Sequence, residues 1–128
     1  MTVFNTGFRL FFGIVLLIWV AMGVSGWEPP PVSAEAVALR DAIFDSGYII
    51  PAVLTVYFLT GLCYLANRFV ALGSIMLFPV SINILLFHSL LNPNPRSLSI
   101  ASALFVANCY MLYLRRGAFA ALLLAREE

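Results

Sequence analysis

Four long stretches without a charged residue divide the chain, at residues 10–27, 46–67, 69–95 and 97–114. Their lengths are 18, 22, 27 and 18 residues. The hydrocarbon core of a bilayer is about 30 Å thick and takes roughly 20 apolar residues of α-helix to cross. The pattern therefore predicts an all-α integral membrane protein, a bundle of four transmembrane helices at about residues 8–27, 48–66, 69–91 and 98–114.

Two shorter segments lie outside the predicted spans. The run Pro29–Pro31 ends the first helix, because proline has no amide donor and its ring clashes with the preceding helical turn. Ser33 is a suitable N-cap for residues 33–45, where apolar and charged residues can occupy opposite sides. This segment is predicted to be a short amphipathic helix on the membrane surface or over the mouth of the bundle. The tail at 117–128 is too short to span and is expected along the interface.

Composition supports a membrane protein and argues against several other classes. Hydrophobic residues make up 62% of the chain and charged residues 10%, against about 25% charged residues in a typical soluble domain. A net charge of +1 without a basic cluster argues against nucleic-acid binding. Cys63 and Cys109 are each isolated in an apolar run, which is not the spacing of a zinc site or a redox-active dithiol. We expect no metal site and no separate soluble catalytic domain.

The arginines predict the orientation in the membrane. Cytoplasmic connections are enriched in Lys and Arg, and four crossings place both termini on the same side. Five arginines lie on the side of the termini and two on the other side: Arg9, Arg68, Arg115, Arg116 and Arg126 against Arg40 and Arg96. Both termini are therefore expected in the cytoplasm. Arg9, Trp27, Arg115 and Arg116 are predicted interface anchors, with the Arg9 side chain extending toward water; contact of Arg9 with a lipid or an anionic ligand is the alternative.

Two asparagines are expected at similar depth in the bilayer. Counted from the exterior ends of the third and fourth spans, Asn83 and Asn108 both lie roughly 12 to 15 Å in. Polar side chains are costly at this depth, so the two amides are predicted to form an interhelical polar contact. Contact with a substrate or a lipid headgroup is the alternative.

His88, the one histidine of the chain, lies about one turn from the exterior end of the third span, with Asn92 four residues later. The acidic residues Glu28, Asp41 and Asp45 are expected on the same side of the membrane. Three roles remain open for His88. It holds the surface helix in place, it moves a proton or donates to a quinone carbonyl, or it ligates the metal of a haem or chlorophyll-type group. His88, Asn83 and Asn92 are the candidate ligand or quinone residues.

Several short segments follow one another between about residues 7 and 116: Phe8–Gly13 (FRLFFG), Ala34–Leu39 (AEAVAL), Ser46–Pro51 (SGYIIP), Leu59–Phe69 (LTGLCYLANRF) and Ser81–His88 (SINILLFH). Their order resembles the DoxX-like family of small bacterial membrane proteins. The most specific part is the string Asn-x-x-x-Phe-His after a proline within the third span.

The resemblance implies a four-helix bundle in the bacterial inner membrane. It also links the chain to thiosulfate oxidation coupled to quinone, or to membrane oxidoreductase complexes, with which some family members are associated. One residue departs from the family pattern. Many relatives carry a glutamate four residues before the glycine of the second span, whereas Tyr57 stands at that distance before Gly61. Redox or proton chemistry that needs this carboxylate is not expected here.

Three functions follow as hypotheses. In the first, the protein is a non-catalytic accessory subunit of a larger membrane complex, respiratory or photosynthetic, because its spans contain no carboxylate, dithiol or nucleotide motif. In the second, it is a subunit of a quinone-linked oxidoreductase of the thiosulfate:quinone type, with His88 at the quinone. In the third, it binds a small molecule or a lipid near Asn83. The bilayer and other membrane subunits are the expected partners; no cofactor of its own is expected, and a bound quinone or lipid is compatible with the pattern.

Overall fold

The computed structural model describes residues 2–27 and 30–123, and these residues form helices and turns without strands. The elements are α1 (Val3–Val24), α2 (Ala34–Asp45), α3 (Ile49–Ala66), α4 (Val70–Leu86), the π-helix η1 (Phe87–Leu91), α5 (Pro95–Leu114) and the 3-10 helix η2 (Arg116–Leu123). Because η1 continues α4, this part of the chain contains four helical segments of 18 to 22 residues that are long and apolar enough to cross a membrane. The predicted all-α architecture with four candidate spans is confirmed. Of the predicted interfacial tail, residues 124–128 lie outside the described residues.

The first and last long helices begin earlier than predicted. α1 starts at Val3, because the Thr2 side chain accepts a hydrogen bond from the backbone N–H of Asn5 at 3.2 Å and caps the helix. α5 starts at Pro95, because Asn94 is its N-cap and proline suits the first helical position. The apolar runs locate the centres of these helices, whereas the capping residues set their first turns.

α1 ends at Val24, two residues before a glycine, rather than at the predicted residue 27. Gly26 has a φ of 75°, and the N–H of Trp27 donates to the carbonyl oxygen of Met22 at 3.2 Å. This Schellman ending needs a left-handed residue, which glycine adopts without strain. The helix therefore ends at Val24, and Trp27 lies beyond it.

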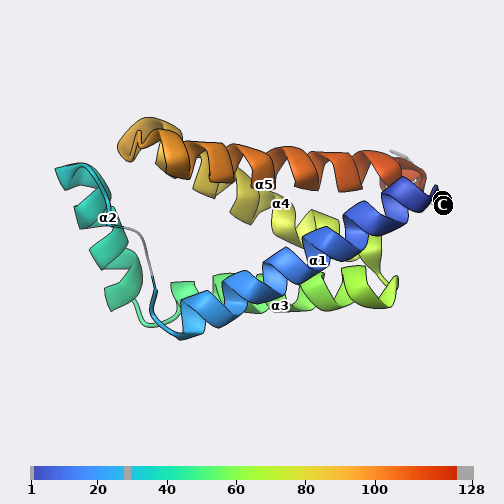
Figure 1. Ribbon diagram of the computed structural model, residues 1–128, viewed down its shortest axis with the longest axis horizontal. Helices are drawn as coiled ribbons and strands as arrows, with labels where there is room; N and C mark the ends of the chain where they lie inside the picture. Colours follow the sequence, from blue (N-terminus) through green and yellow to red (C-terminus); the bar gives the residue numbers. More distant parts are fainter. Residues whose placement is uncertain (1, 28–29, 124–128) are drawn as a thin grey trace.

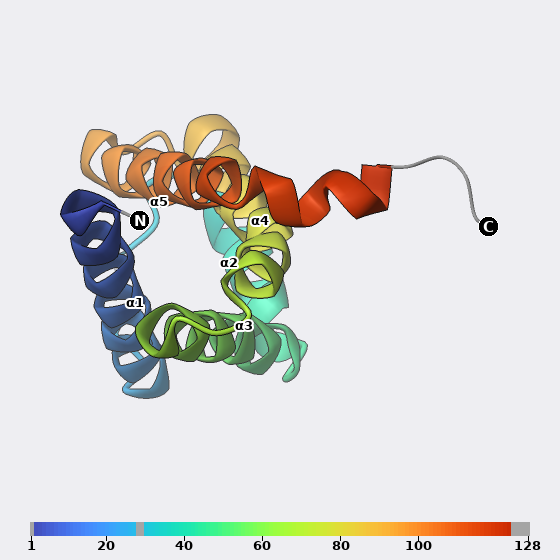
Figure 2. The same ribbon diagram turned by 90° about the vertical axis from the view of Figure 1, so that its right-hand side faces the viewer.

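The four long helices form a ring in the order α1, α3, α4, α5, and α2 crosses one end of it (Figure 1, Figure 2). We call this end the α2 end. The opposite end, where α1 begins and α5 ends, we call the Arg9 end. α1 and α5 meet near the Arg9 end and diverge toward the α2 end (Figure 1). At the Arg9 end, the Tyr110 hydroxyl donates to Asn5 Oδ1 at 2.7 Å, and the Tyr110 ring contacts the Phe8 ring edge to face with centroids 5.1 Å apart.

Glycines allow α3 to approach both of its neighbours closely. A Cβ atom on Gly13 of α1 would lie 3.2 Å from the carbonyl oxygen of Gly61, and one on Gly61 would lie 2.9 Å from a methyl carbon of Leu17. On the other side, a Cβ atom on Gly73 of α4 would lie 3.3 Å from the Thr60 side chain, whose hydroxyl donates to the Gly73 carbonyl at 3.1 Å. Small residues of this kind permit close contact between membrane helices.

The core takes one fully buried large side chain from each long helix: Leu16, Tyr64, Leu77 and Met111. The Tyr64 hydroxyl lies 2.8 Å from that of Ser74, so the polar atom of the tyrosine has a partner. The outer surface instead carries large apolar side chains, among them Phe11 and Val106, which are 66% and 64% exposed. A surface of this composition suits lipid tails or partner helices better than water.

Asn108 of α5 bonds to the backbone of α4 beside Pro79, which lacks an N–H and interrupts the helical hydrogen bonds. The amide is fully buried and is oriented so that its nitrogen faces an acceptor and its oxygen faces donors. The nitrogen donates to the Ser74 carbonyl at 3.1 Å. The oxygen accepts from the N–H of Phe78 at 3.2 Å and from the Ser81 hydroxyl at 3.3 Å. Ser74 and Phe78 are spaced four residues apart in the turn directly before the proline. Asn108 therefore links α5 to α4 next to the interruption of the helical hydrogen bonds.

We predict that Gly61→Val lowers the free energy of unfolding by about 1–3 kcal/mol, because its side chain would force α1 away from α3. Gly7→Val is the matched control, since no atom lies within 4 Å of a Cβ at position 7 of α1. Thermal or chemical unfolding of both variants in one detergent measures the difference. An equal loss at the two positions would assign the effect to helix propensity and contradict the packing argument.

Candidate ligand-binding site

A cavity of about 650 Å³ lies beneath α2, bounded by α2, α3 and the last turns of α4 with η1. Most of its lining is apolar, from residues such as Ile43, Ile50 and Val80. Its polar side chains are Arg40, Asn83, His88 and Asn92. A volume of this size with a few polar groups on an apolar wall is typical of sites that bind small molecules.

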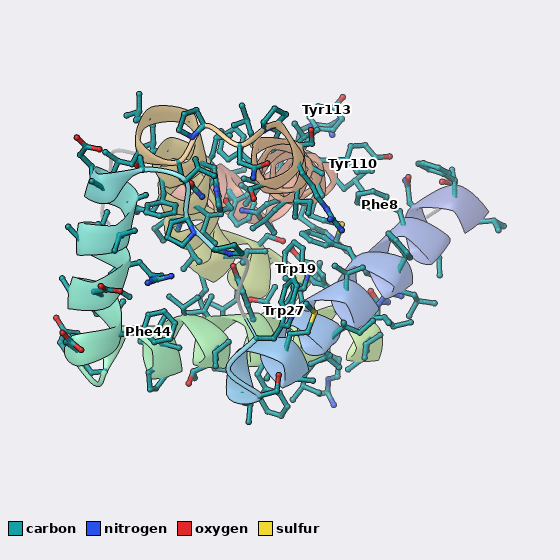
Figure 3. All side chains as sticks on the ribbon, turned by 60° about the vertical axis from the view of Figure 1, so that its left-hand side comes forward. Phe8, Trp19, Trp27, Phe44, Tyr110 and Tyr113 are labelled. Atoms are coloured by element: carbon teal, nitrogen blue, oxygen red, sulfur yellow. The ribbon has the colours of Figure 1, made fainter. Side chains whose placement is uncertain are left out.

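A second cavity of about 480 Å³ lies among α1, α3, α4 and α5 at the same end of the bundle. The two cavities share the lining residues Phe44, Ile50, Val53, Ile84 and His88. Trp19, Trp27 and Tyr57 line the second cavity alone, and Figure 3 shows the two tryptophans near the α2 end of α1. Residues of both α1 and α5 line this cavity, at the end of the bundle where the two helices diverge.

His88 lies where the two cavities adjoin, and a π-helix places it there. In η1 the N–H of Asn92 donates to the carbonyl five residues back, that of Phe87, at 2.9 Å. The Asn92 amide oxygen is occupied by the N–H of Val32, so its nitrogen faces His88 Nδ1, 3.4 Å away. Because the Asn92 amide nitrogen is a donor, Nδ1 accepts in this contact, and the tautomer with its proton on Nε2 fits it. In that tautomer the Nε2–H can donate to an oxygen in the cavity.

Two hydrogen bonds attach the start of α2 to η1. The Val32 N–H donates to Asn92 Oδ1 at 2.8 Å, and the Ser33 hydroxyl donates to the carbonyl oxygen of Leu91. Asn92 is buried and also contacts His88, so a single amide connects the helix over the cavity to the histidine inside it. The surface helix is thus held by Asn92 rather than directly by His88.

The acidic side chains expected near His88 do not supply its partner. Asp41 accepts two hydrogen bonds from Arg40, at 2.9 and 3.1 Å, and Asp45 is exposed. Glu28 lies outside the described residues. The charged face of α2 turns its carboxylates away from the bundle, while Arg40 reaches the cavity wall. Among the residues described, the charged side chain that lines the first cavity is Arg40, which is paired with Asp41.

Asn83 and Asn108 do not form the predicted pair. Asn83 donates to the carbonyl of Pro79 in its own helix at 2.7 Å and lines the first cavity. Asn108 bonds to Ser74, Phe78 and Ser81, as described above. Counting residues from the helix ends gave their depths but not the directions of their side chains, which differ. Asn83, Asn92 and His88 are nevertheless brought to one cavity.

Sequence reasoning did not place Arg40, Trp19 or Tyr57 at this site. Tyr57 is buried beside Trp19, with ring centroids 6.0 Å apart, and no hydrogen bond joins its hydroxyl to another residue in the described ranges. A tyrosine in the middle of an apolar span was the available signal, because its hydroxyl needs a polar partner or a cavity. Arg40 gave no signal, since a charged residue on a surface helix normally faces water.

The predicted interface anchors behave differently from one another. Arg9 does not extend to the surface but is buried, with 5% of its area exposed. Trp27 is exposed, and Arg116 lies over a tyrosine ring with its guanidinium carbon 4.3 Å from the ring centroid. Arg115 donates to Asn67 Oδ1 at 3.1 Å. Arg9 was predicted to reach water because it lies near a helix start, but its side chain turns into the bundle.

We predict that Asn92→Ala loosens α2 and speeds backbone hydrogen exchange of residues 34–45 by about 3- to 10-fold, the effect of losing one modest hydrogen bond. Ser89→Ala is the control, because Ser89 is an exposed residue of η1 whose hydroxyl donates within its own helix at 3.2 Å. Unchanged exchange in the Asn92 variant would show that α2 is held by other contacts.

No family model, curated protein or solved structure matches the chain. The resemblance to the DoxX-like family therefore stays a prediction, and the case for a function depends on the cavities and the residues that line them.

Proposed function

We propose that the protein is a multi-pass membrane protein that binds an amphipathic small molecule, a lipid or a quinone, at the α2 end of the bundle. The observation that carries the proposal is the position of His88 at the junction of two mostly apolar cavities of about 650 and 480 Å³. The tautomer that fits its contact with Asn92 leaves the Nε2–H as the ring donor. The oxygen-bearing end of the ligand accepts a hydrogen bond from His88, and its apolar body lies in the second cavity.

The charge of the lining favours a neutral or anionic ligand over a cation. No carboxylate from the described part of the chain lines either cavity, whereas Arg40 lines the first and Arg96 the second. Asp41 partly balances Arg40 through its two hydrogen bonds. A ligand with carbonyl, ester or phosphate oxygens thus meets donors, and an amine would meet positive charge.

Access from the bilayer fits the arrangement of the helices. α1 and α5 diverge toward the α2 end (Figure 1). Residues of both helices line the second cavity. In this proposal both termini are cytoplasmic and the α2 end faces the exterior side of a bacterial inner membrane, because the arginines gather at the Arg9 end. The ligand then enters from the outer leaflet.

A quinone is the more specific of the two candidate ligands. It carries two carbonyl oxygens as acceptors and, in membranes, a long apolar tail. His88 can donate to a carbonyl oxygen, and the second cavity can contain part of the apolar tail. If the protein is a quinone-linked oxidoreductase subunit, electrons come from a partner subunit and His88 positions the quinone, because Tyr57 replaces the glutamate expected from the family resemblance.

The accessory-subunit hypothesis stays a prediction, supported by the large apolar side chains on the outer faces of several helices. Native mass spectrometry after gentle extraction from the native membrane tests it. Larger subunits that travel with the 14.1 kDa chain are the expected result for an accessory subunit. A clean monomer or a small homo-oligomer would contradict it.

We predict that Val53→Phe combined with Ile84→Phe weakens ligand binding about tenfold, equivalent to about 1.4 kcal/mol, because both positions line both cavities. The two tryptophans of the chain, Trp19 and Trp27, line the second cavity and report binding by fluorescence quenching. The probes are a short-tailed ubiquinone analogue and a brominated phospholipid, each added to the purified protein in detergent.

The control variant carries the same changes on the outside, Leu59→Phe with Leu86→Phe, at exposed positions of α3 and α4. Equal quenching in wild type, filled and control proteins would mean that the probes only partition into the micelle, against the proposal. His88→Leu separates the ligands, since it should weaken the quinone analogue through loss of the Nε2–H donor. Saturable quenching by the brominated lipid alone would assign the site to a lipid.

A further inference from the structure

A second unusual site lies at the Arg9 end, away from both cavities. Arg9 is 95% buried by area, being 5% exposed, and its Nε and Nη1 atoms have no hydrogen-bond partner among the described residues. Burying a guanidinium charge is costly when the lost hydration is not replaced by acceptors. An anion held against Arg9 would supply both the acceptors and the counter-charge.

Arg115, the C-cap of α5, brings a second guanidinium to the same end of the bundle. One of its terminal nitrogens donates to Asn67 Oδ1 at 3.1 Å, while its buried Nε has no partner within the described part of the chain. The two arginines therefore present three buried nitrogen atoms, with four N–H groups, that lack acceptors among the described residues.

The distribution of charge makes an acidic side chain of the described residues an unsuitable counter-ion. Their carboxylates, Glu35, Asp41 and Asp45, all belong to α2 at the opposite end of the bundle. Arg68 and Arg116 add exposed positive charge near the Arg9 end. Figure 2 looks onto this end, where α1, α3, α4 and α5 form a ring.

We propose that Arg9 and Arg115 together bind the phosphate of an anionic lipid of the adjacent leaflet. Paired guanidinium groups match phosphate through charge-assisted, bidentate hydrogen bonds. Basic pockets between membrane helices are suited to anionic headgroups. Arg9 stands six residues after the start of α1, about 9 Å along the helix, which is within reach of the headgroup region. This site does not depend on the cavities beneath α2.

The test compares lipids that differ in net charge. The full chain is purified in a neutral detergent and supplied with phosphatidylglycerol, phosphatidylcholine or inorganic phosphate. We expect phosphatidylglycerol to raise the Tm and to remain bound in native mass spectrometry, and phosphatidylcholine to do neither. Arg9→Met should reduce retention of phosphatidylglycerol about tenfold or more, through loss of charge-assisted hydrogen bonds. If inorganic phosphate alone stabilises the protein, the site binds an oxyanion but the proposal that this anion is a lipid headgroup is wrong.

Arg68→Met is the matched control, because Arg68 is an exposed arginine at the same end. If both variants lose bound phosphatidylglycerol equally, the effect is due to general surface charge and the proposed site is wrong. Arg9→Met should be at least as stable as wild type in phosphatidylcholine, since it removes a buried charge without a partner. If it is less stable in every lipid, Arg9 is structural and the proposal is wrong.

Two further variants complete the test. If Arg9→Met does not fold, Arg115→Met provides the same comparison. Glu127→Gln with Glu128→Gln examines the acidic residues near the end of the sequence, which lie outside the described residues. Loss of the Arg9-dependent Tm difference in that double variant would identify a carboxylate of the chain as the counter-ion and overturn the lipid.

Discussion

Every buried backbone N–H and carbonyl group in an apolar bundle needs a hydrogen-bond partner. Pro79 interrupts the helical hydrogen bonds of α4, and in the turn before it Asn108 of the neighbouring helix bonds to the Ser74 carbonyl and the Phe78 N–H. The same contact fixes α5 against the middle of α4. The part of α4 beyond Pro79 continues into η1, which contains His88. The position of the candidate site therefore depends on how α4 is fixed beside Pro79.

The two ends of the bundle are built differently. Toward the Arg9 end, α1 and α5 meet through Tyr110, and the aromatic ring of Tyr64 fills the interior. Toward the α2 end the same two helices diverge, and α2 lies over the space that results. Close packing through Gly13, Gly61 and Gly73 holds α3 to α1 and α4 along the bundle. The cavities can therefore exist without loss of the fold, because the packing that stabilises the bundle lies elsewhere.

The sequence predicts some parts of this structure well, because they depend on local chemistry. Charge-free runs of about 20 residues indicate spans, and Ser33 indicates the start of α2, where its hydroxyl caps the helix. The directions of side chains were not predictable in the same way. Asn83 and Asn108 lie on different helices, so their mutual orientation depends on packing that one sequence does not encode locally. Arg9 illustrates the same limit, since its position near a helix start does not reveal that it turns inward.

The two candidate sites differ in what their ligands must supply. His88 lines two cavities that are large enough to enclose the apolar part of a ligand. Its ring N–H then fixes where the oxygen-bearing end of that ligand binds. Arg9 is enclosed by side chains and offers charge rather than volume, so selection there depends on an anion. A ligand that binds only the folded state stabilises that state by an amount that grows with the logarithm of its concentration relative to its Kd. Because the sites lie at opposite ends and share no lining residue, the stabilising effects of the two ligands should add.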